Sequence, residues 1–424
     1  MGEPALCLTG VRLGSAPDAV AVRCVDGMIA ELGPDVVAAP NDRLLDLRGR
    51  GLIMLPGFVN AHTHAAMSLF RNYADDLPLM DWLSNHIWPI EARMVAEDVY
   101  WGTRLAALEM IRTGTVSFWD MYWNCEATAA AVGDAGLRAT IGGAIFDAGQ
   151  SAVEVERLKA VALDGLGAIP LISPLTASAL APHAIYTASA SLLRWVAATA
   201  AEHDVPIHIH LSETADEVER CLDEHRMRPA FWLHQLGILG PKTLLAHSVW
   251  LDEAELDLIA ETGATLVTNP VANLKLNVGR IFDYPAASAR GIAVALGTDG
   301  PGSNNSLDLL AEAKHFALGQ KQRADDPAAV PAAEVLALAR GRRAPLFGAV
   351  PLALGVPADF ILVRGDSPEL GLGALDAGLV YAASGSIVDT TVVAGRVLMR
   401  GGVIEGAEEV LAGARGRAEL IGLR

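Results

Sequence analysis

The chain has 424 residues, of which 52% are hydrophobic and 19% are charged. This composition can fill a sizeable core, and no uninterrupted apolar run approaches the roughly 20 residues that a membrane-spanning helix needs. The formal net charge of −18, from 32 basic and 50 acidic residues, disfavours binding to the phosphates of nucleic acids.

The N-terminal stretch MGEPALCLTGVRLG contains an acidic residue near its start and no basic segment before an apolar core. We therefore expect no secretory signal and a cytoplasmic location. The four cysteines, Cys7, Cys24, Cys125 and Cys221, are scattered without CxxC spacing. Their spacing predicts buried thiols, and it argues against a disulfide framework or a thiolate zinc cluster.

Both ends of the chain carry a strand pattern. Residues 1 to about 50, and again about 356 to 405, alternate apolar and polar residues between Gly and Asp turns, which is typical of antiparallel strands. We expect the two ends to meet in one small β-sandwich. The predicted domains are a composite sandwich of residues 1–52 and 356–424, and a barrel of residues 53–355.

The middle of the chain alternates short apolar runs with amphipathic stretches of helical period, a pattern that predicts parallel strands joined by crossover helices. Eight such strand-helix units within about 250 residues match the size of a (β/α)₈ barrel. One predicted helix follows Asp252, with Glu255 three residues on as in a capping box and Gly263 as a stop. The eight runs are LIMLPGFVNAH, TVSFWDMY, RATIGGAIFD, LTASALAPHAI, PIHIHLSE, TLLAHSVW, TLVTNPVAN and VALGTDG.

Metal-competent residues stand at the carboxyl ends of these runs, where barrel enzymes build their active sites. His62 and His64 are two apart in a strand, so both point to the same side. On its own an HxH pair is more often hydrogen-bonded than ligating. Together with His210 and Asp299 from other strands, it supplies three nitrogens and a carboxylate, a set that suits zinc and leaves room for a water.

Other polar residues at this end have two interpretations each. Glu213 follows the fifth strand, where it could reach substrate and water, or it could simply be a carboxylate at a helix start. His208 shares a face with His210 one layer deeper, which favours a hydrogen-bonded core histidine. His183 and His247 end the fourth and sixth strands. The loop GTDGPGSNNS lacks a lysine and fits no common phosphate motif, so we interpret it as the turn that positions Asp299.

The segments PGFVNAHTH, APHAIYT, IHIHLSE, LLAHSVW, NPVANLKL and GTDGPGSNN, in this order, resemble the amidohydrolase superfamily. Within it, LFRNYADDLPLMDWL and HIWPIEARM are similar to the S-adenosylhomocysteine/methylthioadenosine deaminase family, which is related to the s-triazine chlorohydrolases. The resemblance runs from about residue 50 to 400. The fourth strand ends without the lysine that bridges two metals in binuclear relatives, which fits the mononuclear type.

The resemblance implies that His62, His64, His210 and Asp299 bind one divalent metal, zinc before Fe²⁺ or Mn²⁺, with a water completing the site. Asp299 would then take the proton of that water and His247 would hold and polarise the hydroxide. Glu213 would protonate the ring nitrogen beside the attacked carbon. The implied reaction is hydrolytic removal of the C6 amino group of an adenosine-type nucleoside, with release of ammonia.

The resemblance also implies substrate contacts. Glu91 corresponds to a carboxylate that accepts hydrogen bonds from the ribose hydroxyls, and Trp82 and His183 to residues that line the purine and sugar pocket. Read without the family, Glu91 could be a surface ion-pair partner, Trp82 a core aromatic and His183 a capped loop residue. Relatives are expected to form dimers or tetramers, so we expect a homo-oligomer.

One departure bears on the substrate. Relatives that accept S-adenosylhomocysteine present arginines after the third strand, whereas Gly143 and Val153 stand where we look for them, and Arg157 is the candidate left. We therefore expect a neutral 5′-substituent, as in methylthioadenosine, 5′-deoxyadenosine or adenosine. Two alternatives remain: a deaminase or chlorohydrolase of a ribose-free heterocycle such as a triazine or pterin, and a non-catalytic scaffold on the same barrel.

Overall fold

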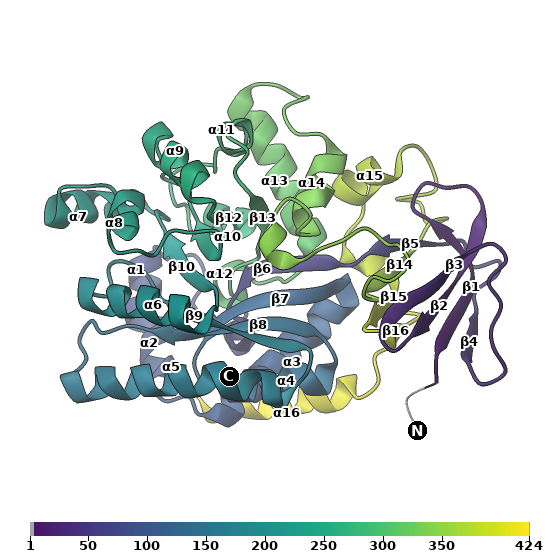
Figure 1. The fold of residues 1–424 in the computed structure, drawn as a ribbon, viewed down its shortest axis with the longest axis horizontal. Helices are drawn as coiled ribbons and strands as arrows, with labels where there is room; N and C mark the ends of the chain where they lie inside the picture. The colour runs from purple at the N-terminus through teal and green to yellow at the C-terminus, as the bar shows by residue number, and fades with distance from the viewer. Residues whose placement is uncertain (1–3, 424) are drawn as a thin grey trace.

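The computed structural model describes residues 4–423, which form a parallel barrel and, beside it, a mixed sheet (Figure 1). The barrel strands follow one another in chain order, each parallel to the next. They are β6 (Phe58–Thr63), β7 (Thr115–Tyr122), β8 (Arg138–Ile145), β9 (Thr176–Pro182), β10 (Ile207–Leu211), β11 (Thr243–His247), β12 (Thr265–Thr268) and β13 (Val294–Leu296). The expected eight-stranded barrel is confirmed.

The barrel closes between its first and last strands. Beyond the end of β13, the backbone N–H groups of Thr298 and Asp299 donate hydrogen bonds to the carbonyl of His62 at the end of β6, at 3.1 and 3.0 Å. This closure brings Asp299 beside the HTH segment, although more than 230 residues separate them in the chain.

The first apolar run, expected as one strand, is divided at Gly57. Its first half is β5 (Leu52–Pro56), which pairs with the mixed sheet, and its second half is β6 of the barrel. A Cβ at position 57 would collide with the side chain of Val116, so only glycine permits the two sheets to meet so closely here. A continuous apolar run does not reveal this division, because both halves are buried.

Helices cover the outside of the barrel (Figure 1). In α9, Asp252 and Glu255 form the expected capping box and Gly263 ends the helix with φ 74°. The larger helices are α3 (Ala96–Thr113), α4 (Cys125–Ala135), α5 (Ala152–Ile172), α6 (Ala190–His203), α7 (Ala215–His225), α8 (Pro229–Gln235), α9 (Glu253–Thr262), α13 (Leu309–Ala324) and α14 (Ala332–Ala339). Shorter ones are α10 (Pro270–Lys275), α11 (Tyr284–Ala289), α12 (Pro301–Asn304) and the 3₁₀ turn η3 (Pro345–Phe347).

A long excursion between β6 and α3 rises over the carboxyl end of the barrel. It contains the 3₁₀ helix η1 (Ala65–Phe70), α1 (Leu79–Asp81), the π-helical turn η2 (Trp82–Ile87) and α2 (Trp88–Glu91). π-Helical turns are rare and often mark functional sites.

The two chain ends form one mixed sheet of eight strands, in the order β16-β15-β14-β5-β1-β2-β3 with β4 on β1. The antiparallel expectation is wrong for two pairs: β4 and β5 both run parallel to β1. The reason is that residues 34–42 carry the chain back to the start of β1, where Arg43 pairs with Leu6. The strands are β1 (Leu6–Leu13), β2 (Ala19–Val25), β3 (Met28–Gly33), β4 (Arg43–Asp46), β14 (Phe360–Arg364), β15 (Val388–Val393) and β16 (Arg396–Arg400), with β5 as above.

The C-terminal helix α16 (Ala407–Leu420) packs on α3 and η1 of the barrel part (Figure 1). Arg417 of α16 binds Asp98 of α3 through its Nε at 2.7 Å. The domain division expected above, with residues 356–424 in the composite sandwich, stays a prediction. The short elements before β15 are α15 (Leu375–Ala377), η4 (Gly378–Ala382) and η5 (Gly385–Ile387).

The sequence predicts no membrane-spanning helix and four buried cysteine thiols. Within residues 4–423, no helix is both long and apolar enough to span a bilayer. All four cysteines are free thiols; Cys7, Cys24 and Cys221 are buried, and Cys125 is half-buried.

Candidate active site

The expected site residues converge at the carboxyl ends of the barrel strands. His62 belongs to β6 and His64 follows it, His210 lies in β10, His247 ends β11, and Asp299 follows β13. His247 and Asp299 have positive φ angles of 65° and 61°, which L-residues rarely adopt and which surrounding structure must stabilise. The sharp turns that follow the strands thus direct these side chains inward.

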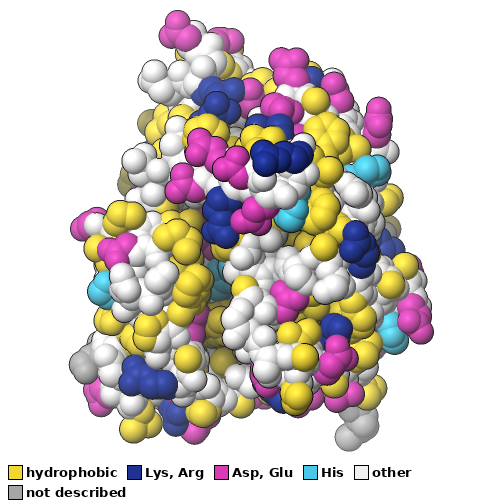
Figure 2. All heavy atoms as spheres, turned by 90° about the vertical axis from the view of Figure 1, so that its left-hand side faces the viewer, with side chains coloured by type: hydrophobic (Ala, Val, Ile, Leu, Met, Phe, Trp, Pro, Cys, Tyr) yellow, Lys and Arg dark blue, Asp and Glu magenta, His cyan; other side chains and the backbone are white. Residues whose placement is uncertain are grey.

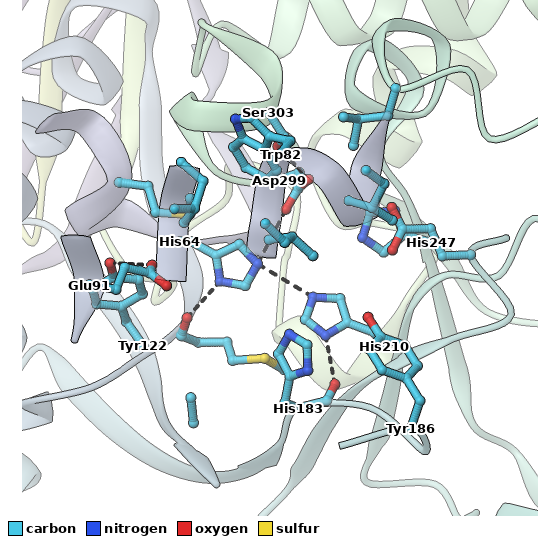
Figure 3. A pocket seen from close by; sticks show the side chains of 18 of the residues that line it. His64, Trp82, Glu91, Tyr122, His183, Tyr186, His210, His247, Asp299 and Ser303 are labelled. Atoms are coloured by element: carbon cyan, nitrogen blue, oxygen red, sulfur yellow. Dashed lines mark hydrogen bonds and ion pairs between the residues drawn. The ribbon is translucent and has the colours of Figure 1, made fainter. Parts of the chain in front are cut away.

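Four side chains present ligand atoms to one point (Figure 3 shows three of them). The Nε2 atoms of His62 and His64 lie 3.4 and 3.2 Å from Oδ1 of Asp299. The Nε2 atoms of His64 and His210 are 3.4 Å apart. The sets His62, His64, His210 and His62, His247, Asp299 each place their ligand atoms within 4.8 Å of one another, close enough to hold a metal ion.

The Nδ1 atom of each of the three histidines has a contact of its own. Nδ1 of His64 donates to the carbonyl of Met121, and Nδ1 of His210 to the carbonyl of His183, both at 2.6 Å. Nδ1 of His62 lies 2.7 Å from Nε2 of His208, the deeper histidine of β10. Such outer contacts set the tautomer and leave the Nε2 lone pair for a cation.

The donor set fits a divalent cation. Among the described residues 4–423, no group makes a well-aligned hydrogen bond to the buried Nε2 of His62, as expected for an atom that serves a metal. Burial lowers the pKa of His62 to about 3 and that of His210 well below its usual value. Both rings are therefore neutral near pH 7, the form that binds metals.

Asp299 supplies the negative charge of the site. Burial alone would raise its pKa, but the ring nitrogens of His62 and His64, within 3.4 Å of its carboxylate, hold that pKa well below the ordinary value. Ser303, one turn into α12, donates from Oγ to Oδ2 of Asp299 at 2.5 Å. Oδ1 of Asp299 remains directed at Nε2 of His62 and His64, so the carboxylate attracts a positive charge at this point.

Glu213 and His247 lie on one wall of the pocket. Nδ1 of His247 donates to Oδ1 of Asn273 at 2.8 Å and lies 3.6 Å from Oε1 of Glu213. Burial raises the pKa of Glu213, with a further contribution from Asp299. The carboxylate of Glu217 accepts the backbone N–H groups of Ser212 and Glu213, at 2.8 and 2.9 Å. Glu213 is thus rigidly placed and able to hold a proton.

The expected substrate residues line the same pocket as Glu213. Trp82 in η2, Glu91 in α2 and His183 after β9 all line it (Figure 3). Tyr122 donates from its hydroxyl to Oε1 of Glu91 at 2.6 Å. Burial raises the pKa of Glu91 to about 7, against the opposing effect of the Tyr122 hydroxyl. Among residues 4–423, Glu91 has no ion pair with a basic side chain, and its second oxygen is available as an acceptor.

Sequence reasoning missed the three hydroxyl-bearing residues of this pocket, namely Tyr122, Tyr186 and Ser303. Tyr122 ends the second barrel strand, and Ser303 lies four residues after Asp299, so position at a strand end could have indicated both. Tyr186 lies in the loop after β9, and its role as a wall residue follows only from packing.

The hollow has two parts with shared walls. An inner pocket of about 70 Å³ lies over the four metal-competent side chains, and an outer cavity of about 650 Å³ adjoins it. Both are lined by Glu91, Tyr122, Trp123 and His183. Figure 2 shows the molecule from the side of α7 and α8, where the surface is hollowed near its centre and acidic and basic side chains are interspersed.

Comparison with known proteins agrees with this architecture. Residues 53–398 match the family model described as the amidohydrolase family. The chain is 47% identical over 373 residues to a 5′-deoxyadenosine deaminase of Methanoregula boonei, covering 87% of this chain and 84% of that relative. It is 41% identical over 386 residues to 5-methylthioadenosine/S-adenosylhomocysteine deaminase 1 of Archaeoglobus fulgidus, covering 90% of each.

A solved structure is similar along its whole length. The crystal structure of an adenosine deaminase from Xanthomonas campestris with bound zinc superposes with a TM-score of 0.91, at 33% identity and with 99% of each chain covered. A barrel with a His and Asp cluster that can hold a divalent metal at its carboxyl end defines a metal-dependent hydrolase of the barrel type. The chain belongs to the amidohydrolase family.

Proposed function

We propose that the protein is a zinc-dependent deaminase that hydrolyses the C6 amino group of adenosine-type nucleosides, namely 5′-deoxyadenosine, methylthioadenosine, adenosine or S-adenosylhomocysteine. The observation that carries the proposal is the position of Glu91. Its carboxylate lines the same pocket as Glu213 and Asp299 and has the Tyr122 hydroxyl as its side-chain partner, so it can accept hydrogen bonds from a ribose diol. The names of the relatives described above support the same substrate class.

His62, His64, His210 and Asp299 would hold the cation. When bound, it would act as a Lewis acid and make hydroxide available from water near neutral pH. The hydrolysis joins an oxygen to C6 and breaks the C6–N bond, so one water is consumed and one ammonia leaves.

The protein's own groups move the protons. Glu213, whose pKa is raised by burial, donates a proton to the ring nitrogen beside C6 as that carbon becomes tetrahedral. Asp299 accepts one proton from the attacking water and returns it to the departing amine. The second proton of the water passes to Glu213 as the new C6–OH becomes a carbonyl, which restores Glu213 to its protonated form. His247, held by Asn273, faces the new oxygen and stabilises its charge.

Substrate entry requires a movement. The inner pocket of about 70 Å³ has room for a few water molecules, so a purine ring enters only when part of the lining yields. The π-helical turn that carries Trp82 is the element best suited to move, because its backbone lacks regular α-helical bonding. Trp82 would then cover the bound ring.

An ammonia-release assay tests the proposal. The purified protein, loaded with one zinc per chain, is expected to deaminate 5′-deoxyadenosine and methylthioadenosine, and to act poorly on adenine. Faster turnover of adenine, a triazine or a pterin would favour the ribose-free alternative. Less than a tenth of an equivalent of zinc, iron or manganese per chain, unrestored by added metal, would favour a scaffold. Light scattering of the same sample would test the homo-oligomer that we also propose.

A further inference from the structure

The outer cavity is large and mostly apolar. It adjoins the inner pocket across Glu91, Tyr122 and His183, and its volume of about 650 Å³ far exceeds what a methyl group needs. Most of its wall is apolar or aromatic, formed by Trp88, Met94, Trp123, Phe146 and Leu158.

The inference rests on the proposed function. If the purine ring lies over the metal site and the ribose hydroxyls meet Glu91, the 5′-carbon points away from the metal and into the outer cavity. The outer cavity therefore contacts whatever the nucleoside carries at its 5′-position.

A single ion pair stands at the rim of this cavity. Glu154 and Arg157, both in the first part of α5, line it. Nε of Arg157 lies 2.9 Å from Oε2 of Glu154, and Nη2 lies 2.6 Å from Oε1. Nε and Nη2 of Arg157 thus both donate to the carboxylate of Glu154, which is the bidentate arrangement that arginine and carboxylate groups favour.

Within residues 4–423, no lysine and no second arginine lines the outer cavity. Of the described residues that line the outer cavity, Arg157 alone carries a lysine or arginine side chain. Val153 is 81% exposed. Gly143, which has no side chain, lines a neighbouring cavity together with Glu126 and Arg157. A substrate carboxylate entering the outer cavity would therefore meet an arginine that is already neutralised, together with the carboxylates of Glu91 and Glu154.

We propose that Glu154 is a specificity-determining residue that neutralises Arg157, so that the outer cavity accepts a bulky uncharged 5′-substituent and disfavours an anionic one. The pair is exposed at 60% for Arg157 and 35% for Glu154. Exposed pairs are weak, so the selection is modest and can be reversed by removing one charge.

Two nucleosides of similar size separate charge from bulk: 5′-butylthioadenosine and 5′-carboxypropylthioadenosine. The wild-type enzyme is expected to show a kcat/KM for the butyl compound that exceeds that for the carboxylate. In Glu154→Gln the ratio of kcat/KM for the butyl compound to kcat/KM for the carboxylate should fall roughly fivefold, because KM for the carboxylate decreases. A roughly fivefold change is about the strength of one exposed charge pair. A glutamine at position 154 also preserves the helix start capped by Ser151.

Glu156→Gln is the matched control. Glu156 pairs with Lys159 on the same helix, its side chain is 71% exposed, and it does not line the outer cavity, so this variant makes the same change in net charge. We expect its ratio to equal that of the wild type. Adding Arg157→Ala to Glu154→Gln should abolish the gain, since no cation then remains for the carboxylate.

An unchanged ratio in Glu154→Gln, an equal fall in Glu156→Gln, or a wild-type preference for the carboxylate would each overturn the inference. In all three cases, deamination of 5′-deoxyadenosine would still support the proposed function. Absence of ammonia release from every nucleoside by the zinc-loaded enzyme would overturn both.

Discussion

Nδ1 of His62 and Nε2 of His208 lie 2.7 Å apart, and both residues are fully buried. A histidine that points into the barrel one layer below the site thus holds the ring of a proposed metal ligand. Its pKa is lowered well below the ordinary value by burial, so the contact joins two neutral imidazoles.

Replacement of this deeper histidine should weaken metal binding. His208→Phe keeps a ring but removes the nitrogen that orients His62, and loss of such an outer contact typically costs roughly 10- to 100-fold in metal affinity. Competition with a chelator during zinc titration measures the effect. The exposed His203, at the end of α6, supplies the control His203→Gln, and equal zinc affinity in the two variants would contradict the prediction.

Glu213→Gln should leave fold and metal content intact and remove most of the rate. A positioned proton donor contributes roughly 10² to 10⁴-fold, and glutamine has the shape of glutamate without its transferable proton. Ammonia release and zinc content are measured on the same preparation. Glu219→Gln, at an exposed position of the same helix α7, should have wild-type kinetics; wild-type speed in Glu213→Gln would exclude our role for that residue.

Ser303→Ala tests the hydrogen bond that holds the carboxylate of Asp299. The hydroxyl of Ser303 donates to Oδ2 of Asp299 at 2.5 Å, and a hydrogen bond to a charged group contributes roughly 1.5–3 kcal/mol. We expect kcat to fall by about tenfold, which corresponds to roughly 1.4 kcal/mol, while KM changes little. Ser15→Ala, at an exposed turn remote from the barrel mouth, controls for loss of a hydroxyl. A change in KM alone would mean that Ser303 contacts substrate instead.

The affinity for nucleosides should depend on pH through Glu91. Its pKa is raised to about 7 by burial, so the carboxylate ionises as pH rises through 7 and becomes the better acceptor for two hydroxyls. KM for 5′-deoxyadenosine should therefore fall between pH 6 and pH 8, an interval of about one unit on either side of that pKa.

The substitution Tyr122→Phe should shift the pH dependence of KM. The hydroxyl of Tyr122 stabilises the Glu91 anion at 2.6 Å, so its removal should raise the pKa of Glu91 and shift the fall in KM to higher pH. In Glu91→Gln the pH dependence should vanish and KM should rise at every pH. A flat KM profile in the wild-type enzyme would show that Glu91 does not bind the diol in the way we propose.

The barrel and the separate sheet could be predicted because their signals are local. Buried parallel strands are continuous apolar runs, and several here have a histidine or an acidic residue at or just beyond the strand end. The spacing of His62 and His64 by two residues places both on one face, and the capping box at Asp252 determines where α9 begins. These features depend on neighbours within about ten residues, so the amino-acid sequence alone is enough to infer them.

Contacts between distant segments could be decided only by the tertiary structure. The division of one apolar run at Gly57 and the parallel placement of β4 and β5 on β1 have no local signature. The same is true of the Tyr122 hydroxyl on Glu91 and of the outer cavity whose rim carries Glu154 and Arg157. Side-chain identity and spacing establish which groups can do chemistry, whereas packing of elements far apart in the chain establishes which group faces which.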